Sequence, residues 1–141
     1  MNPLKLLAIA ILVVTFQGLI LYSADATVPM PTSSALPMYP ARARFAHVEG
    51  RVTVWFVVDG QGNVVQAGVA SGNSMLSGAA LNIVRSWRFA AGDLAQDVRH
   101  QTEFNYVLGG QEKKGAPKLT VSMTDFRRVQ VQSGLYVEAI E

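Results

Sequence analysis

Residues 50–70 read GRVTVWFVVDGQGNVVQAGVA. Alternate positions in the first half form a wholly apolar row: Val52, Val54, Phe56 and Val58. A period of two places such a row on one face of a β-strand. Asp59–Asn63 follow as turn formers, and their glycines can adopt positive φ. Apolar character then resumes at Val64, so the pattern predicts a β-hairpin. A regular second strand would point Val64 and Val69 to opposite faces, and a bulge at Gly68 would restore the register.

An amphipathic helix is predicted directly after this hairpin, with Ser74 or Asn73 as its N-cap. Its apolar residues recur at the spacing of one helical face: Leu76, Ala79, Ala80, Ile83, Val84 and Trp87. Strand, hairpin, strand and helix in this order are half of a small α+β domain, in which the helix covers one face of an antiparallel sheet. Trp87 ends the apolar stripe and is expected in the core.

Further elements are expected on both sides. Pro40–His47 can form a short helix with an apolar side of Ala41, Phe45 and Val48. Val98–Leu108 alternates again and predicts a third strand with a polar outer row. Residues 118–141 are expected to be β-rich, with Phe126–Val131 and Leu135–Ile140 pairing around residues 132–134. Trp55, on the outer face of the first strand, is either covered by this C-terminal extension or exposed as a contact.

Several spaced motifs resemble the TonB C-terminal domain family, in the form of a short TonB-like energy transducer. They are the Tyr39-Pro40 opening, the Gly50-x-Val52-x-Val54 hairpin and the helix that ends in Trp87-Arg88-Phe89. The resemblance implies a three-stranded antiparallel sheet with helices on one face. The domains expected are a signal peptide or membrane anchor (1–26), a Pro-rich linker (27–38), a TonB C-terminal-like domain (39–110) and a β-rich extension (111–141).

The N-terminal hydrophobic segment, Leu6–Tyr22, follows Lys5 and has two interpretations. Seventeen residues are at the short end of what crosses a bilayer, whereas Ala24-Asp25-Ala26 offers a small-x-small cleavage pattern. The domain is therefore expected in the periplasm. It is either soluble after signal cleavage near Ala26 or anchored to the inner membrane by residues 6–22.

The residues do not indicate an enzyme, a cofactor, a metal site or nucleic-acid binding. The chain has no cysteine, so its core alone must stabilise it and cysteine-type metal sites are excluded. His47 and His100 stand apart from each other, while a metal site needs three or four converging ligands. No nucleophile with an acid–base pair is recognisable. A net charge of +2, scattered along the chain, is not the pattern of a nucleic-acid-binding surface.

The resemblance implies binding of a TonB-box-like peptide of an outer-membrane or envelope partner along the last strand of the domain. An extended peptide adds to an open sheet edge through backbone hydrogen bonds. The expected partner-binding residues are Val98, Arg99, Gln101, Glu103, Asn105, Val107 and Tyr39. The resemblance also implies inner-membrane partners similar to ExbB and ExbD. The alternative is a structural or assembly module of the envelope, in which sheet edges pair with another protein or with a second copy to form a homodimer.

Overall fold

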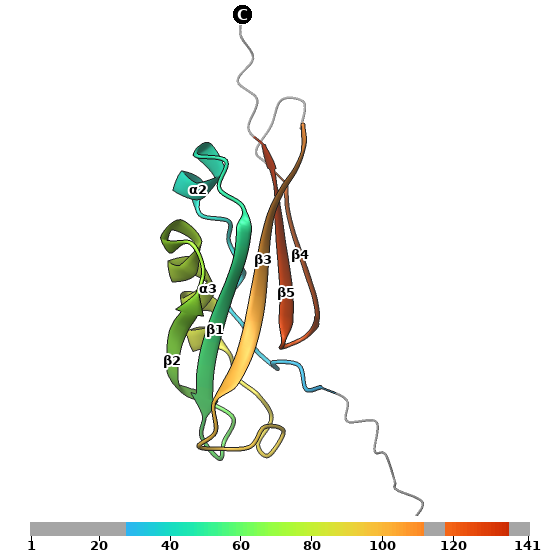
Figure 1. Cartoon of the computed structure of the whole chain (residues 1–141). Helices are drawn as coiled ribbons and strands as arrows, with labels where there is room; N and C mark the ends of the chain where they lie inside the picture. The colour runs from blue at the N-terminus through green and yellow to red at the C-terminus, as the bar shows by residue number, and fades with distance from the viewer. Residues whose placement is uncertain (1–27, 112–117, 136–141) are drawn as a thin grey trace, which may run out of the picture.

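The computed structural model describes residues 28–111 and 118–135. The predicted signal or anchor segment lies outside these residues. The elements, in chain order, are α2 (Ala41–Phe45), β1 (Gly50–Val58), β2 (Val64–Ser71), α3 (Ser74–Ser86), β3 (His100–Gln111), β4 (Leu119–Asp125) and β5 (Arg128–Leu135) (Figure 1). Neither helix in this part of the chain has the length and apolar character needed to cross a membrane.

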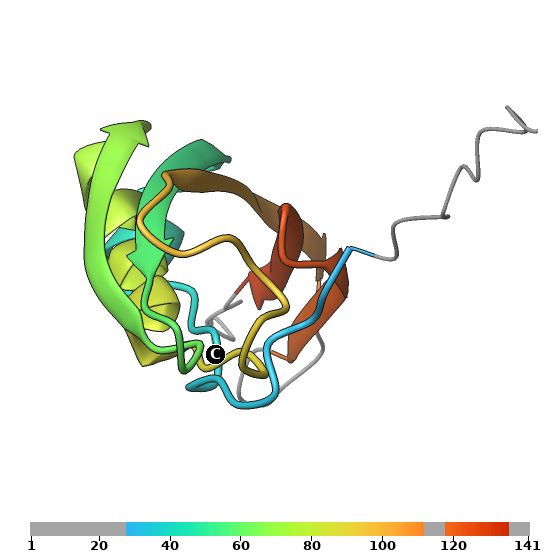
Figure 2. The same cartoon turned by 90° about the horizontal axis from the view of Figure 1, so that it is seen from below.

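The five strands of the described residues form one mixed sheet in the order β2-β1-β3-β5-β4. The predicted pairing of β1 with β2 and with β3 is antiparallel, as expected. The prediction of a three-stranded sheet is wrong, because the C-terminal extension adds β4 and β5, and β5 runs parallel to β3. Seen from below, the sheet curves so that α3 and the N-terminal segment lie on its inner side (Figure 2).

The predicted β1–β2 hairpin is confirmed, and the Asp59 side chain organises its turn. One carboxylate oxygen accepts hydrogen bonds from the backbone N–H groups of Gln61 and Asn63, both at 2.9 Å. Hydrogen bonds from Asn63 hold the pKa of Asp59 below its ordinary value. Gly62 has φ 85°, and a Cβ there would lie 2.1 Å from the Phe89 carbonyl oxygen, so the turn requires glycine.

The predicted bulge lies elsewhere. Register shifts fall between Val57 and Val58 and between Thr53 and Val54 of β1, which leaves Val65 and Ala70 of β2 as the extra residues. Gly68 pairs regularly with Trp55. A Cβ at Gly68 would lie 2.6 Å from the indole. Glycine is therefore required at this position by close packing.

Helix α3 covers β1 and β2 and carries the predicted apolar face. Asn73 is the N-cap, and its side-chain oxygen accepts from the Met75 N–H at 2.8 Å. The helix buries Leu76, Ala80, Ile83 and Val84. Trp87, just past the helix, is buried edge-on against Phe56, with the ring centroids 5.6 Å apart. The prediction that Trp87 belongs to the core is confirmed.

Helix α2 has a different buried side from the one predicted. Ala43 is fully buried, whereas Ala41 is exposed and Phe45 is 71% exposed. Positions two apart in a helix differ by about 200° in direction, so a five-residue helix that buries Ala43 turns Phe45 outward. The short helix therefore presents one small residue to the core.

The C-terminal extension is β-rich as predicted, but the predicted position of its turn is wrong. The turn lies at Phe126–Arg127, where an Asp125 carboxylate oxygen accepts from the Arg127 N–H at 2.6 Å. Ser133, expected in a turn, is a buried residue of β5. Residues 136–140 of the second predicted strand lie outside the described residues. We call β4, the turn and β5 (residues 119–135) the C-terminal hairpin.

Residues 32–35 of the predicted linker are bonded to the end of α3. Thr32 N–H donates to the Arg88 carbonyl at 2.7 Å, and Arg88 N–H donates to the Ser33 carbonyl at 3.0 Å. The Trp87 indole N–H donates to the Ser34 hydroxyl at 3.1 Å, and Ala35 N–H donates to the Ser86 hydroxyl at 2.8 Å. We call this bonded segment the N-terminal clip.

Candidate functional site

Strand β3, on which peptide binding was predicted, is paired on both sides. β1 runs antiparallel along one side, from Gly50 opposite Tyr106 to Phe56 opposite His100. β5 runs parallel along the other side, and Glu103 N–H donates to the Arg127 carbonyl at 2.8 Å. The expectation that β3 has an open edge is therefore wrong, because the C-terminal hairpin fills it.

The predicted partner-binding residues fall into three environments. Glu103 and Asn105 line an outer polar groove, and Gln101 and Val107 belong to the same outward row of β3. Val98 and Arg99 are exposed and precede β3. Tyr39 is buried, and its hydroxyl donates to the Val48 carbonyl at 2.6 Å. Tyr39 thus belongs to the core rather than to the exposed surface.

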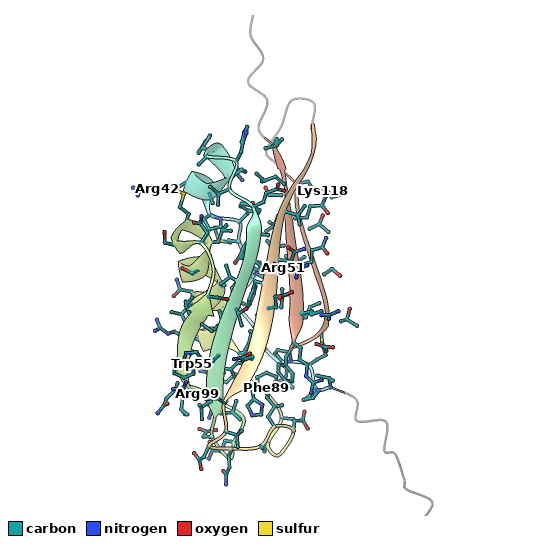
Figure 3. The ribbon with its side chains drawn as sticks, viewed as in Figure 1. Arg42, Arg51, Trp55, Phe89, Arg99 and Lys118 are labelled. Atoms are coloured by element: carbon teal, nitrogen blue, oxygen red, sulfur yellow. The ribbon has the colours of Figure 1, made fainter. Side chains whose placement is uncertain are left out.

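Trp55 lies on the outer face of β1 beside Arg99, whose guanidinium carbon is 4.2 Å from the ring centroid (Figure 3). This distance is that of a cation–π contact. The C-terminal hairpin lies on the far side of β3 from β1, so it does not provide the cover for Trp55 that was one of the two alternatives. Trp55 is half-buried, packed between Arg99 and the space left by Gly68.

A polar groove of about 370 Å³ crosses the outer face of β1, β3, β5 and β4. An Arg51 guanidinium nitrogen lies 3.9 Å from a Glu103 carboxylate oxygen, and Arg128 stands opposite Glu103 in the β3–β5 register. The remaining lining residues are Asn105, Ser122, Thr124, Val129 and Gln130. Arg128 could not be assigned to this groove from the sequence, because no local pattern indicates that β5 pairs with β3.

The inner face of β5 completes the core. Val129 and Val131 are buried opposite Phe104 and Tyr106 of β3. Phe126, at the turn, is buried in an aromatic pocket whose walls are Phe56, Phe89 and His100, with ring centroids 5.7, 5.9 and 6.1 Å away. These side chains fill positions that an open β3 edge would leave exposed.

Two tyrosines pack against each other in this core. The Tyr39 and Tyr106 rings pack edge-to-face with centroids 5.4 Å apart. Burial, and then the charge of Glu49, raises the pKa of Tyr39 to about 12. Burial, and then Tyr39, raises the pKa of Tyr106 still further. The Tyr106 hydroxyl has no hydrogen-bond partner among the described residues.

The outermost strands of the described sheet are β2 and β4. Two register shifts interrupt β2, which makes it an irregular template for a further strand. β4 reads LTVSMTD and has no charged residue before Asp125. Leu119 and Val121 of β4 are 41% and 39% exposed. β4 is therefore the more regular of the two outer strands, with apolar side chains left partly uncovered.

The histidines lie apart from each other. His100 belongs to the aromatic pocket, and its Nε2 is 2.8 Å from the Ala95 carbonyl oxygen. His47 follows α2 with φ 52°. No group of three or more potential metal-ligating side chains comes together within residues 28–111 and 118–135.

The family model described as the Gram-negative bacterial TonB protein C-terminal matches residues 35–108, just over half of the chain. The chain belongs to the TonB C-terminal domain family. Among curated proteins, Protein TonB of Salmonella typhimurium (strain LT2) is 38% identical over 68 residues, which are 47% of this chain. The chain spans only 28% of that relative's length.

The family match ends within β3, at residue 108. It includes α2, β1, β2, α3 and most of β3, in agreement with the resemblance found in the sequence. The C-terminal hairpin lies beyond the matched residues, yet it pairs with the last strand of the TonB C-terminal domain and completes its core.

Proposed function

We propose that this chain acts in the periplasm as a TonB-type protein. In this role it binds an extended segment of an outer-membrane or envelope protein and supports TonB-dependent transport. The observation that supports the proposal is the match of residues 35–108 to the TonB C-terminal domain family. Residues 6–22 direct export and are either cleaved near Ala26 or kept as an inner-membrane anchor. When kept, they are the part available to ExbB-like and ExbD-like partners.

The proposed mode of binding is strand addition. Extended peptides gain affinity from backbone hydrogen bonds to a sheet edge and selectivity from pockets for alternate side chains. Glu103, Asn105 and Val107 lie on β3, the strand along which the family resemblance places the bound peptide. The Glu103 N–H points toward the side of β3 that β5 covers. A partner segment can bond to the backbone of these residues only where β5 separates from β3.

Binding of synthetic peptides tests this function. The peptides correspond to the periplasmic N-terminal segments of outer-membrane receptors from the same organism, and scrambled versions of each serve as controls. Fluorescence anisotropy of the labelled peptides with the full-length chain should show saturable binding of the receptor segments and none of the scrambled ones. Equal binding of both sets, or of neither, contradicts the proposal.

One observation favours the alternative, an assembly module that acts by sheet-edge pairing. β4 is an outer strand without a charged residue before Asp125, and Leu119 and Val121 are partly exposed. Such an edge is a template for another strand, including β4 of a second copy. Sedimentation velocity should then show a concentration-dependent homodimer that Val121→Lys abolishes. A wild-type chain that stays monomeric at high concentration contradicts this alternative.

A further inference from the structure

The side of the domain that the helices form carries exposed apolar side chains around a groove. Leu36 is 87% exposed, Met38 66% and Met75 48%, and all three line a groove of about 470 Å³ beside α3. Gly78, on the side of α3 opposite its buried residues, leaves open space where a Cβ would lie. The other lining residues are uncharged: Ala35, Pro40, Ser74, Ala79, Asn82 and Ile83. The groove is therefore mostly apolar and faces away from the sheet.

Helix α2, which begins just after Pro40 at this groove, adds an apolar side chain between two cations. Successive helical positions differ by about 100°, so Phe45 points away from the buried Ala43, with Arg42 and Arg44 on either side. The Arg44 guanidinium carbon lies 5.9 Å from the Phe45 ring centroid. Arg42 projects outward from α2, away from the sheet (Figure 3). We define the helical patch as Leu36, Met38, Arg42, Arg44, Phe45 and Met75.

The helical patch belongs to the part of the chain that lacks carboxylates. Residues 28–48 and 60–92 contain neither Asp nor Glu, and their charged residues are Arg42, Arg44, Arg85 and Arg88. Glu49 is the next acid after α2, and its carboxylate accepts a hydrogen bond from the Leu108 N–H of β3. A partner that complements this surface is therefore anionic and also accepts apolar side chains.

A bilayer that contains anionic phospholipid has both properties. Arginine binds phosphate through charge-assisted hydrogen bonds, and its long side chain keeps the charge among the headgroups while apolar neighbours enter the acyl boundary. Leu36 and Phe45 project far from the protein surface, with 87% and 71% exposure. A fluid lipid interface accepts such side chains without preformed pockets, which a folded protein partner would have to provide.

The chain length before the clip favours the same partner. Residues 23–31 lie between the hydrophobic segment Leu6–Tyr22 and the clip, and they span at most about 30 Å when extended. β1 alone has nine residues and is about as long. An anchor at residues 6–22 would therefore keep the domain beside the bilayer.

We infer that the helical patch docks the domain on the surface of an anionic phospholipid bilayer. Leu36, Met38 and Phe45 enter the interface, and the two arginines of α2 bind lipid phosphates. The argument from chain length rests on the anchored form in the proposed function, whereas the charge and the exposed side chains stand without it. In the docked state the outer face of the sheet points to the periplasm.

The full-length chain in lipid nanodiscs tests this inference, because discs leave both membrane surfaces accessible. The chain has no cysteine, so one introduced cysteine carries an environment-sensitive fluorophore. Ala41→Cys places the fluorophore on the exposed side of α2, one turn before Phe45. Thr124→Cys, in the outer polar groove, is the matched control. Quenching by acrylamide measures the fraction of each fluorophore that lipid shields.

The fluorophore at Ala41→Cys should be shielded on phosphatidylglycerol discs and accessible on phosphatidylcholine discs. The fluorophore at Thr124→Cys should be accessible on both. Since docking depends on charge, the shielding should also decrease as the salt concentration rises.

Substitutions in the patch should shift the ratio of docked to undocked chain. Arg42→Gln/Arg44→Gln should lower this ratio about thirtyfold on phosphatidylglycerol discs. Leu36→Asn, at a side chain too exposed to support the core, should lower it about tenfold. Arg51→Gln/Arg128→Gln makes the same charge change on the outer face of the sheet and should leave the ratio within about twofold. Thermal unfolding checks that each variant is folded.

Three outcomes overturn the inference. Equal shielding of the two fluorophores means that the domain has no preferred face toward lipid. Equal shielding on the two kinds of disc means that the arginines do not select the surface. An accessible fluorophore at Ala41→Cys on every disc, with a folded chain, means that the patch does not dock on lipid and leaves it to a protein partner. The binding of receptor peptides is measured without lipid, so the proposed function stands or fails separately.

Discussion

The ring of Phe126 stands edge-on against the ring of Phe56, with the centroids 5.7 Å apart and the ring planes at 85°. This contact joins the C-terminal hairpin to the core of the family-matched domain. Phe126→Ala should therefore lower the free energy of unfolding by about 3–5 kcal/mol, the usual cost of truncating a buried phenylalanine. Urea denaturation followed by circular dichroism measures this change.

Thr124→Ala is the matched control for Phe126→Ala, since Thr124 is exposed on the same hairpin. Its free energy of unfolding should stay within about 0.5 kcal/mol of the wild-type value. A similarly small loss for Phe126→Ala would show that the hairpin does not unfold cooperatively with the rest of the domain.

Substitution by alanine should change the stability of the chain in opposite directions at Gly68 and Gly78. A Cβ at Gly68 would lie 2.6 Å from the Trp55 indole, so Gly68→Ala should destabilise the chain by about 1–3 kcal/mol. Gly78 is within α3 and has open space around it, so Gly78→Ala should stabilise the chain by about 0.5–1 kcal/mol. Thermal unfolding midpoints report both signs, and a neutral Gly68→Ala would mean that Trp55 moves aside freely.

The hydroxyl groups of Tyr39 and Tyr106 should contribute differently to the free energy of unfolding at neutral pH. Tyr39 donates to the Val48 carbonyl at 2.6 Å, so Tyr39→Phe should lower the free energy of unfolding by about 1 kcal/mol. The Tyr106 hydroxyl is buried without a described partner, so Tyr106→Phe should be neutral or slightly stabilising. Urea denaturation of the two variants tests this difference, and equal losses would contradict it.

Alkaline pH should destabilise the fold through Tyr39. Its pKa is raised from 10.0 to about 12, so the folded state holds the phenolic proton more tightly than the unfolded chain does. Its contribution is complete below pH 10 and is lost as pH rises from 10 towards about 12. Tyr39→Phe lacks this titration, so the stability advantage of the wild type over Tyr39→Phe, read from the urea midpoints, should shrink and then reverse over this range. A difference that stays constant would mean that Tyr39 titrates normally.

Local patterns predicted about half of the fold. The alternation of residues 52–58, the turn at Asp59–Asn63 and the apolar stripe of α3 each follow from neighbouring residues, and the structure confirms them. Phe45 misled the prediction, because a helix of five residues is too short for its apolar residues to set which side is buried. The prediction of a bulge at Gly68 is wrong for a similar reason. Glycine is needed there because of its close contact with Trp55 on the neighbouring strand, and local sequence does not reveal contacts between strands.

The candidate site was predictable only in part, for a related reason. The resemblance to the TonB family pointed to β3 correctly as the last strand of the family domain. That β5 covers β3 depends on a parallel pairing between residues about 25 positions apart, from Glu103 to Arg128, and no turn signal connects such strands. The alternation in β5 is also brief, with Val129 and Val131 as its inward residues. Sequence periodicity therefore could not distinguish an added strand from an isolated hairpin.

The N-terminal clip sets where a mechanical load enters the domain. A pull from the N-terminal side reaches the bonds that join Thr32, Ser33 and Ser34 to Trp87 and Arg88 before it reaches Tyr39. When these bonds yield one after another, residues 32–38 become slack, a segment that spans at most about 25 Å when extended. Under tension the clip would thus act as an extensible tether that lengthens before Tyr39 is pulled.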